Sequence, residues 1–295
     1  MTSTPPKIVA RRQHNGTPIP EPEVPEGVEV RRDVPFGPHE RQCYDVYLPR
    51  GAARPLPVVV FLHPGAWTRR DKRAVRTMFV LEHGFALVSI GYRLAQHAPF
   101  PAQVQDVNAG LRHLLAHADD YGIDTARLVI AGTSAGAHLG TLATLARDVP
   151  LFGPVPGMRP RGVVAIYGAY DMPALIAAQD EIEIDHSGPD APLALMTGGD
   201  PAQNLDTLRA MSPQSYIRPD APPFYVLHGT EDHVLPWQQS AEFAAGLARA
   251  GVCVAFDLVP GAGHGDEAFR TRPIADRIAA FIQRVTSEKP RQASD

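Results

Sequence analysis

Short apolar runs alternate with longer segments of helical periodicity along most of this chain, and no other feature restricts its fold as strongly. Such short, almost continuously apolar runs are typical of strands that are buried on both faces of a parallel sheet. Their alternation with helices predicts an α/β fold with a doubly wound, mostly parallel sheet. The apolar runs lie at residues 57–62, 86–90, 128–131, 163–167, 224–227 and 254–258. The helical segments lie at residues 73–82, 102–116, 135–147, 238–250 and 273–285.

The N-terminal part of the chain has a different pattern. Residues 1–27 are rich in proline and polar side chains, which favours an extended arm over a packed helix. Apolar and polar side chains alternate in residues 28–36 and again in residues 41–48, and Gly37 and Pro38 lie between the two segments. This pattern predicts an antiparallel hairpin at a sheet edge. A proline-rich arm and an exposed edge strand each offer a surface to a second copy of the chain, and both therefore favour a homodimer.

One α/β domain is predicted at residues 28–287, followed by a short tail at 288–295. Residues 171–215 break the alternation, because Gly, Pro, Asp and Ser separate brief apolar pieces. Ligands of open α/β sheets bind outside the carboxyl ends of the strands, so an insertion there predicts a cap that shapes the substrate pocket. A long connection with one surface helix explains the same pattern, and a mobile lid is the alternative.

Composition and charge exclude several classes of partner. The formal net charge of −4 does not indicate the positively charged surface that binds nucleic acid. No apolar run approaches the roughly 20 residues of a membrane helix, and residues 1–13 lack the apolar core of a secretory signal. Cys43 and Cys253 are too few for a disulfide framework. We therefore expect a cytoplasmic protein with a small-molecule substrate and with neither nucleic acid nor a membrane as partner.

A serine stands in a glycine-rich turn between the predicted strand at 128–131 and the helix that follows it. Residues 132–136 read GTSAG, with Ser134 at the centre. A serine in a tight strand-to-helix turn exposes its hydroxyl, and small residues are needed where the helix and the strand approach closely. Gly132 and Gly136 meet that need. The turn predicts a nucleophile, provided that an acid and then a histidine follow along the chain.

A serine hydroxyl needs a base to remove its proton, and the base needs a partner that holds its tautomer. Asp232 follows the apolar run at 224–227 in a Gly-Thr-Glu-Asp turn, and we predict that it is the acid. Glu231 and Asp257 are the alternative acids. His264 lies in the glycine-rich loop after the next apolar run and is the predicted base.

The loop after the first apolar run is the candidate oxyanion hole. An acyl-transfer enzyme stabilises the oxyanion of its tetrahedral intermediate with preorganised backbone N–H groups. We predict that these donors are the amides of Gly65 and Ala66, together with the amide of Ala135 after the nucleophile. His63 and Trp67 flank this loop and are the predicted pocket residues.

A metal site is not expected from the histidines. His113 and His117 have the i, i+4 spacing of a metal pair on a helix. No glutamate follows His113 at the required place, and no third ligand is evident in the sequence. We therefore predict catalysis without a metal.

Taken together, five motifs resemble the α/β-hydrolase superfamily. Within it, the chain is similar to an esterase branch that contains hormone-sensitive-lipase-like carboxylesterases, kynurenine formamidases and bacterial feruloyl-esterase-like enzymes. The resemblance covers residues 44–285 and implies Ser134 as nucleophile, Asp232 and His264 as its acid and base, and no cofactor. The motifs are HPGAW at 63–67, GYRLA at 91–95 with PFP at 99–101 and Asp106, the turn at Ser134, GTED at 229–232, and the Gly263 and His264 pair.

Two departures bear on the sub-family. Pro64 stands where a glycine is usual, and Gly91 stands where hormone-sensitive-lipase-like members commonly carry an aspartate. Trp67 with Arg69, Asp71 and Lys72 favours the formamidase and feruloyl-esterase-like side.

The sequence therefore predicts a serine carboxylic-ester hydrolase that acts through an acyl-enzyme on small to medium esters. Arylformamidase activity is the alternative, because amide hydrolysis of that type uses the same residues. A ligand-binding homologue without catalytic activity is an alternative of another class, and relatives of that kind typically lack a member of the triad.

Overall fold

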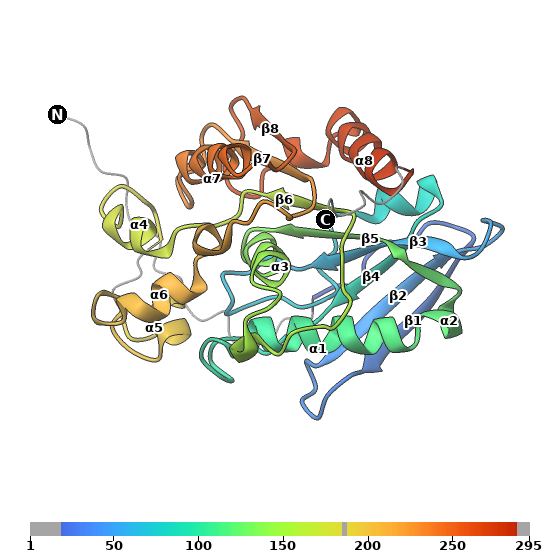
Figure 1. Cartoon of the computed structure of the whole chain (residues 1–295), viewed down its shortest axis with the longest axis horizontal. Helices are drawn as coiled ribbons and strands as arrows, with labels where there is room; N and C mark the ends of the chain where they lie inside the picture. Colours follow the sequence, from blue (N-terminus) through green and yellow to red (C-terminus); the bar gives the residue numbers. More distant parts are fainter. Residues whose placement is uncertain (1–18, 185–187, 288–295) are drawn as a thin grey trace.

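The structure is a computed structural model that describes residues 19–184 and 188–287 of the chain. Its centre is an eight-stranded sheet in the order β1-β2-β4-β3-β5-β6-β7-β8 (Figure 1). Strands β3 to β8 run parallel to one another, whereas β1 and β2 are antiparallel to their neighbours. The predicted mostly parallel sheet is confirmed. The strands are β1 (Val28–Pro35), β2 (Cys43–Pro49), β3 (Leu56–Leu62), β4 (Ala86–Ile90), β5 (Ile123–Thr133), β6 (Gly162–Ile166), β7 (Phe224–Gly229) and β8 (Val254–Val259).

Helices cover both faces of this sheet (Figure 1). Buried side chains of α1, α3 and α7 form one hydrophobic core with the sheet, and those of α8 form a second core. In β3, Val58 and Val60 belong to the first core, while Val59 and Phe61 belong to the second. Successive strand residues point to opposite faces, so this apolar run is buried on both sides. These helices are α1 (Ala102–Ala116), α3 (Ala135–Leu145), α7 (Trp237–Arg249) and α8 (Arg272–Ser287), and the short α2 (Ala118–Tyr121) follows α1.

Strands β1 and β2 form the predicted antiparallel hairpin at one edge of the sheet. Val28 pairs with Pro49 at one end of the ladder, and the register shifts between Arg31 and Val34. β1 is the last strand on this side, so its outer edge pairs with no strand among the described residues. The homodimer expected from this edge stays a prediction.

The described part of the predicted arm lies against the body of the protein. The Glu21 carboxylate forms ion pairs with Arg32 and Arg73, and Val24 packs against the second core. Residues 1–18 of the arm and the predicted tail at 288–295 lie outside the described residues. Of the helices that are described, none is long and apolar enough to cross a membrane.

The helices described between β6 and β7 are all short, and they gather on the left of Figure 1. The backbone of this segment is tied to two loops outside it: Phe100 N–H donates to the carbonyl of Met196, and Glu183 N–H donates to the carbonyl of His233. Those loops follow β4 and β7, so the segment lies beside the carboxyl edge of the parallel strands. Its role as a cap stays a prediction. The elements are α4 (Met172–Ala177), α5 (Pro192–Thr197), α6 (Leu205–Met211), η3 (Pro201–Gln203) and η4 (Pro213–Tyr216).

The predicted helix at residues 73–82 is wrong. Turns occupy the start of this segment, and a short 3₁₀ helix, η1 (Met78–His83), follows them. The side chain of Lys72 is buried, and its backbone carbonyl accepts a hydrogen bond of 2.6 Å from the Ser89 hydroxyl. Apolar side chains of the segment pack against the second core. Their spacing therefore reflects packing against the sheet and not a helical face.

Candidate active site

Ser134 lies in the turn between β5 and α3, where the sequence predicts it. Its backbone has φ 54° and ψ −121°, a conformation that non-glycine residues rarely adopt. An added Cβ at Gly132 would lie 2.6 Å from the nitrogen of Ala137, and one at Gly136 would lie 2.5 Å from the carbonyl carbon of Leu62. The two glycines thus let α3 start directly against the ends of β3 and β5, which holds the strained serine at the edge of the sheet.

A continuous chain of hydrogen bonds connects Ser134, His264 and Asp232. The Nε2 atom of His264 lies 2.9 Å from the Ser134 Oγ, and its Nδ1 atom lies 2.7 Å from Asp232 Oδ2. Since a carboxylate can only accept, Nδ1 carries the proton and Nε2 is left to accept from the serine hydroxyl. The ring of Tyr167 packs edge-on against the imidazole at 4.8 Å. The structure therefore brings together the three residues predicted from chain order.

The carboxylate of Asp232 is held by more hydrogen bonds than the sequence suggests. Its Oδ1 atom accepts the backbone N–H groups of Val234 and Leu235, each at 2.9 Å. Its Oδ2 atom also accepts from a second histidine, His228, at 3.0 Å. Burial alone would raise the pKa of Asp232, but the hydrogen bonds from His228 and His264 hold that pKa well below its usual 3.8. The carboxylate is therefore ionised when the neighbouring imidazole takes a proton.

Sequence reasoning missed His228. This residue belongs to β7 and is fully buried. Its Nδ1 atom lies 2.6 Å from the Ser240 hydroxyl, while Nε2–H is directed at Asp232 and at the Leu235 carbonyl. The available signal was a histidine at the end of an apolar run, four residues before the predicted acid, because buried polar groups need partners.

The loop after β3 has an unusual backbone. Gly65, Ala66 and Trp67 all have positive φ values, of 132°, 49° and 58°. Among the described residues, no hydrogen bond is donated by the N–H groups of Gly65 and Ala66. The loop also lies close to the start of α3, because the carbonyl oxygen of His63 would be 2.8 Å from a Cβ at Gly136. The three predicted oxyanion donors, including Ala135, thus come from two adjoining segments.

The two predicted pocket residues are buried side chains. His63 has no exposed surface, and its ring stacks on Tyr92 with centroids 4.1 Å apart. Burial lowers the pKa of His63 to about 3, so this ring is neutral. Trp67 is 3% exposed, and its indole N–H donates to Nδ1 of His138 at 3.0 Å. Both side chains pack within the protein and have almost no exposed surface that a substrate could contact.

The other candidates raised by the sequence lie apart from this chain of hydrogen bonds. Asp257 accepts from Tyr225 and Arg277 on the outer part of the sheet, and Glu231 lies 3.9 Å from His233. Within the described ranges, no group of three or more His, Cys, Asp or Glu side chains is arranged to hold a metal ion.

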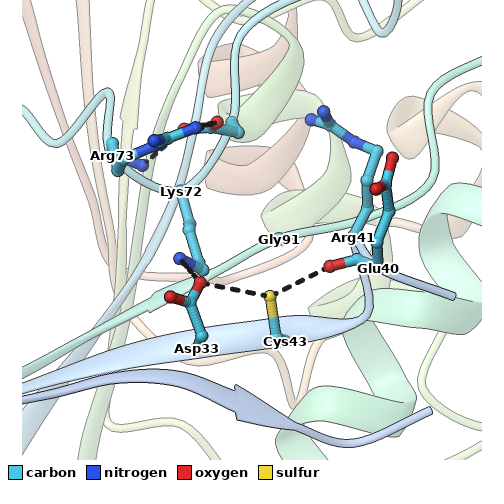
Figure 2. A pocket seen from close by; sticks show the side chains of 8 residues that line it. Asp33, Glu40, Arg41, Cys43, Lys72, Arg73 and Gly91 are labelled. Atoms are coloured by element: carbon cyan, nitrogen blue, oxygen red, sulfur yellow. Dashed lines mark hydrogen bonds and ion pairs between the residues drawn. The ribbon is translucent and has the colours of Figure 1, made fainter. Parts of the chain in front are cut away.

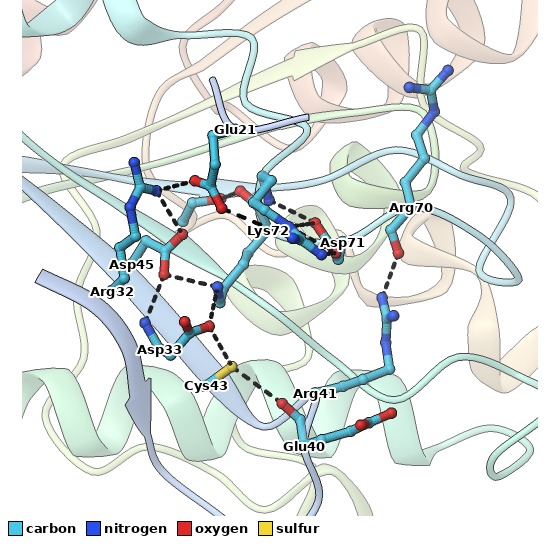
Figure 3. A network of polar contacts seen from close by, with 12 residues as sticks. Glu21, Arg32, Asp33, Glu40, Arg41, Cys43, Asp45, Arg70, Asp71 and Lys72 are labelled. Carbon is cyan, nitrogen blue, oxygen red and sulfur yellow. Dashed lines mark hydrogen bonds and ion pairs between the residues drawn. The ribbon is translucent and has the colours of Figure 1, made fainter. Parts of the chain in front are cut away.

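A polar pocket of about 240 Å³ lies away from the predicted triad, beside the β1–β2 hairpin (Figure 2). Its charges largely pair with each other: the Lys72 ammonium lies 2.7 Å from Asp33 and 2.8 Å from the buried Asp45, and Arg73 binds Asp71 (Figure 3). The lining contains no serine or histidine, and burial raises the pKa of its one thiol, Cys43, so this pocket holds no activated nucleophile for hydrolysis. Its lining residues are Asp33, Glu40, Arg41, Cys43, Asp71, Lys72, Arg73 and Gly91.

Comparison with known proteins identifies the family. The sequence model of the BD-FAE family matches residues 44–247, which is more than half of the chain. The chain belongs to the BD-FAE family. Its fold is that of α/β-hydrolase esterases, which confirms the resemblance drawn from the motifs.

Individual relatives of this BD-FAE protein agree with that assignment. It is 31% identical to "Esterase LipC" of Mycobacterium tuberculosis over 90% of this chain and 68% of the relative. It is also 31% identical to "Esterase LipQ" of the same organism, over 85% of this chain and 61% of the relative. A solved structure described as a "Truncated form of carbohydrate esterase from gut microbiota" superposes with a TM-score of 0.79, at 25% identity, over 88% of this chain and 97% of that one.

Proposed function

We propose that this BD-FAE protein is a serine carboxylic-ester hydrolase that acts through an acyl-enzyme on small to medium esters. The observation that carries the proposal is the position of His264, which lies within hydrogen-bond distance of both Ser134 Oγ and Asp232 Oδ2. A nucleophile, a base and an orienting acid in contact are the minimal set for acyl transfer. The esterase names of the relatives agree with this chemistry.

In the first half of the reaction, Ser134 Oγ attacks the ester carbonyl while His264 Nε2 takes the hydroxyl proton. The imidazolium that forms is stabilised by the ionised Asp232, which keeps the Nδ1 proton in place. When the tetrahedral intermediate collapses, the proton on Nε2 passes to the leaving alcohol. The product of this half is an ester between Ser134 and the acyl group.

The N–H groups of Gly65, Ala66 and Ala135 stabilise the negative charge on the carbonyl oxygen by donating hydrogen bonds to it. Removal of one such donor typically lowers kcat by about 10²- to 10³-fold. In the second half, His264 takes a proton from water, the hydroxide attacks the acyl carbon, and Ser134 regains its proton from Nε2. No cofactor is needed for either half.

The test is hydrolysis of p-nitrophenyl acetate, butyrate and octanoate by the wild type and by Ser134→Ala, with a fluorophosphonate as covalent label. We expect turnover that falls with acyl chain length, a single label on Ser134, and a loss of kcat of about 10⁶-fold in the variant. An aryl formamide at equal concentration compares amide with ester hydrolysis. A wild type that neither turns over an ester nor takes the label overturns the proposal and leaves ligand binding as the function.

A further inference from the structure

His138 lies one helical turn after Ser134 and connects three parts of the site. It is completely buried in α3, and both of its ring nitrogens have partners. Nδ1 accepts from the indole N–H of Trp67 at 3.0 Å, and Nε2–H donates to the carbonyl of Met211 at 2.8 Å. A carbonyl can only accept, so the proton is on Nε2 and the lone pair of Nδ1 faces the indole.

Trp67 ends the strained stretch of the oxyanion loop. Ala66 and Trp67 both have φ near +50°, which costs non-glycine residues about 1–3 kcal/mol each unless their surroundings hold them. The backbone of the loop is tied by Arg69 N–H to Gly65 and by Ala95 N–H to Trp67. Among the described residues, the Trp67 indole makes the only side-chain hydrogen bond between this loop and the nucleophile helix. The indole ring lies edge-on to the His138 ring, with centroids 5.2 Å apart.

We propose that His138 is a positioning residue that, through Trp67, holds the N–H groups of Gly65 and Ala66 where the oxyanion forms. The inference rests on the proposed ester hydrolysis at Ser134, since an oxyanion hole has a use only in that reaction. The same imidazole fixes the end of α6 through Met211, so the segment between β6 and β7 and the oxyanion loop share one support.

The protonation state of His138 suits this role. Burial lowers the pKa of His138 to about 4, and the hydrogen bond to the Met211 carbonyl offsets only part of that shift. The ring is therefore neutral near pH 7 and keeps a lone pair for the indole. A charged ring would present N–H groups on both sides and repel the N–H of Trp67.

The test is a double-mutant cycle with His138→Phe and Trp67→Phe. Each single variant removes the anchor, so we expect kcat for p-nitrophenyl acetate to fall about 10- to 100-fold with KM within about twofold. Because the two residues act as one unit, the double variant should lose no more than the larger single loss. His138→Gln keeps an acceptor and a donor and should recover most of kcat.

Thr144→Val is the matched control, because Thr144 is also buried in α3 and donates to the Gly140 carbonyl at 2.8 Å. It should lower Tm without changing kcat. Affinity for a trifluoromethyl ketone, which forms an oxyanion adduct with the serine, should fall in the His138 and Trp67 variants in proportion to kcat. Losses that multiply in the double variant, or a kcat that falls as much in Thr144→Val, would overturn the proposal.

Failure of the proposed function is visible separately. A wild type without turnover or fluorophosphonate label refutes ester hydrolysis whatever the variants do. Hydrogen exchange of the Trp67 indole, assigned by its loss in Trp67→Phe, reports the anchor without any substrate. Slow exchange in the wild type and fast exchange in His138→Phe are expected, and equal rates in the two proteins refute the anchor itself.

Discussion

Replacement of Gly136 by alanine tests how closely the nucleophile helix must approach the oxyanion loop. The new Cβ would lie 2.5 Å from the carbonyl carbon of Leu62 and 2.8 Å from the carbonyl oxygen of His63. Both are backbone atoms, and ordinary contact begins near 3.4 Å. The carbonyl oxygen of Leu62 is closer still, so relief of these overlaps requires α3 and the end of β3 to separate by more than about an ångström, because no side chain can move aside.

This separation acts on catalysis as well as on stability. Ala135 is carried by α3, whereas Gly65 and Ala66 follow β3, so the three proposed donors move apart. A misplacement of about 1 Å costs about 100-fold in rate, which corresponds to about 2.7 kcal/mol of activation free energy. The strain also lowers the free energy of unfolding by about 1–3 kcal/mol, which the higher helix propensity of alanine partly offsets.

The assay is kcat/KM for p-nitrophenyl acetate, measured with the urea unfolding curve of each variant. Gly140→Ala is the matched control one turn further along α3, since its Cβ would meet only side-chain methyl groups of Ile130 and Leu62 at 2.7 and 3.2 Å. We expect this control to lose stability but to keep kcat/KM within about threefold. If folded Gly136→Ala retains wild-type kcat/KM, or if Gly140→Ala loses as much activity, the reasoning is refuted.

Two further predictions concern charge. Because the folded pKa of Asp232 lies below its usual 3.8, its ionised form stabilises the fold above about pH 4, and this contribution is lost as pH falls through the folded value. The free energy of unfolding should therefore decrease below pH 4, more steeply in the wild type than in Asp232→Asn; equal slopes contradict the shift. Lys72→Met leaves the buried Asp45 carboxylate with only the longer, partly exposed ion pair to Arg32 at 3.8 Å and should cost up to about 3–5 kcal/mol in urea unfolding, whereas loss of Asp33, whose side chain is 75% exposed, should cost under about 1 kcal/mol.

Most of the fold was predictable because the apolar runs are buried on both faces of the sheet. A run such as β3 has to satisfy two hydrophobic cores, and this leaves a pattern that few other structures produce. The prediction of a helix at 73–82 was wrong for the opposite reason. Its apolar residues pack on one side only, and its start is fixed by Lys72 and its hydrogen bond from Ser89, contacts that have no local pattern.

The position of the candidate site was predictable for a topological reason. Ser134, Asp232 and His264 each follow a parallel strand, and the carboxyl ends of such strands meet at one edge of the sheet. Chain order was therefore enough to bring them together. His138 was not predictable in this way, because it contacts partners that are 71 and 73 residues away along the chain.

The oxyanion loop is held at its two ends by different interactions. Loss of one or the other should therefore affect kcat and the free energy of unfolding to different extents. Near Gly65 the anchor is the neutral hydrogen bond between Trp67 and His138, which fixes direction. Further along the loop the anchor is ionic, because Lys72 reaches Asp45 within the network of Figure 3. A buried ion pair that loses one partner leaves an uncompensated charge, so its loss appears mainly in the free energy of unfolding. Loss of the indole bond leaves an unpaired buried polar atom but no buried charge, so it lowers the free energy of unfolding by about 1–3 kcal/mol and in addition lowers kcat.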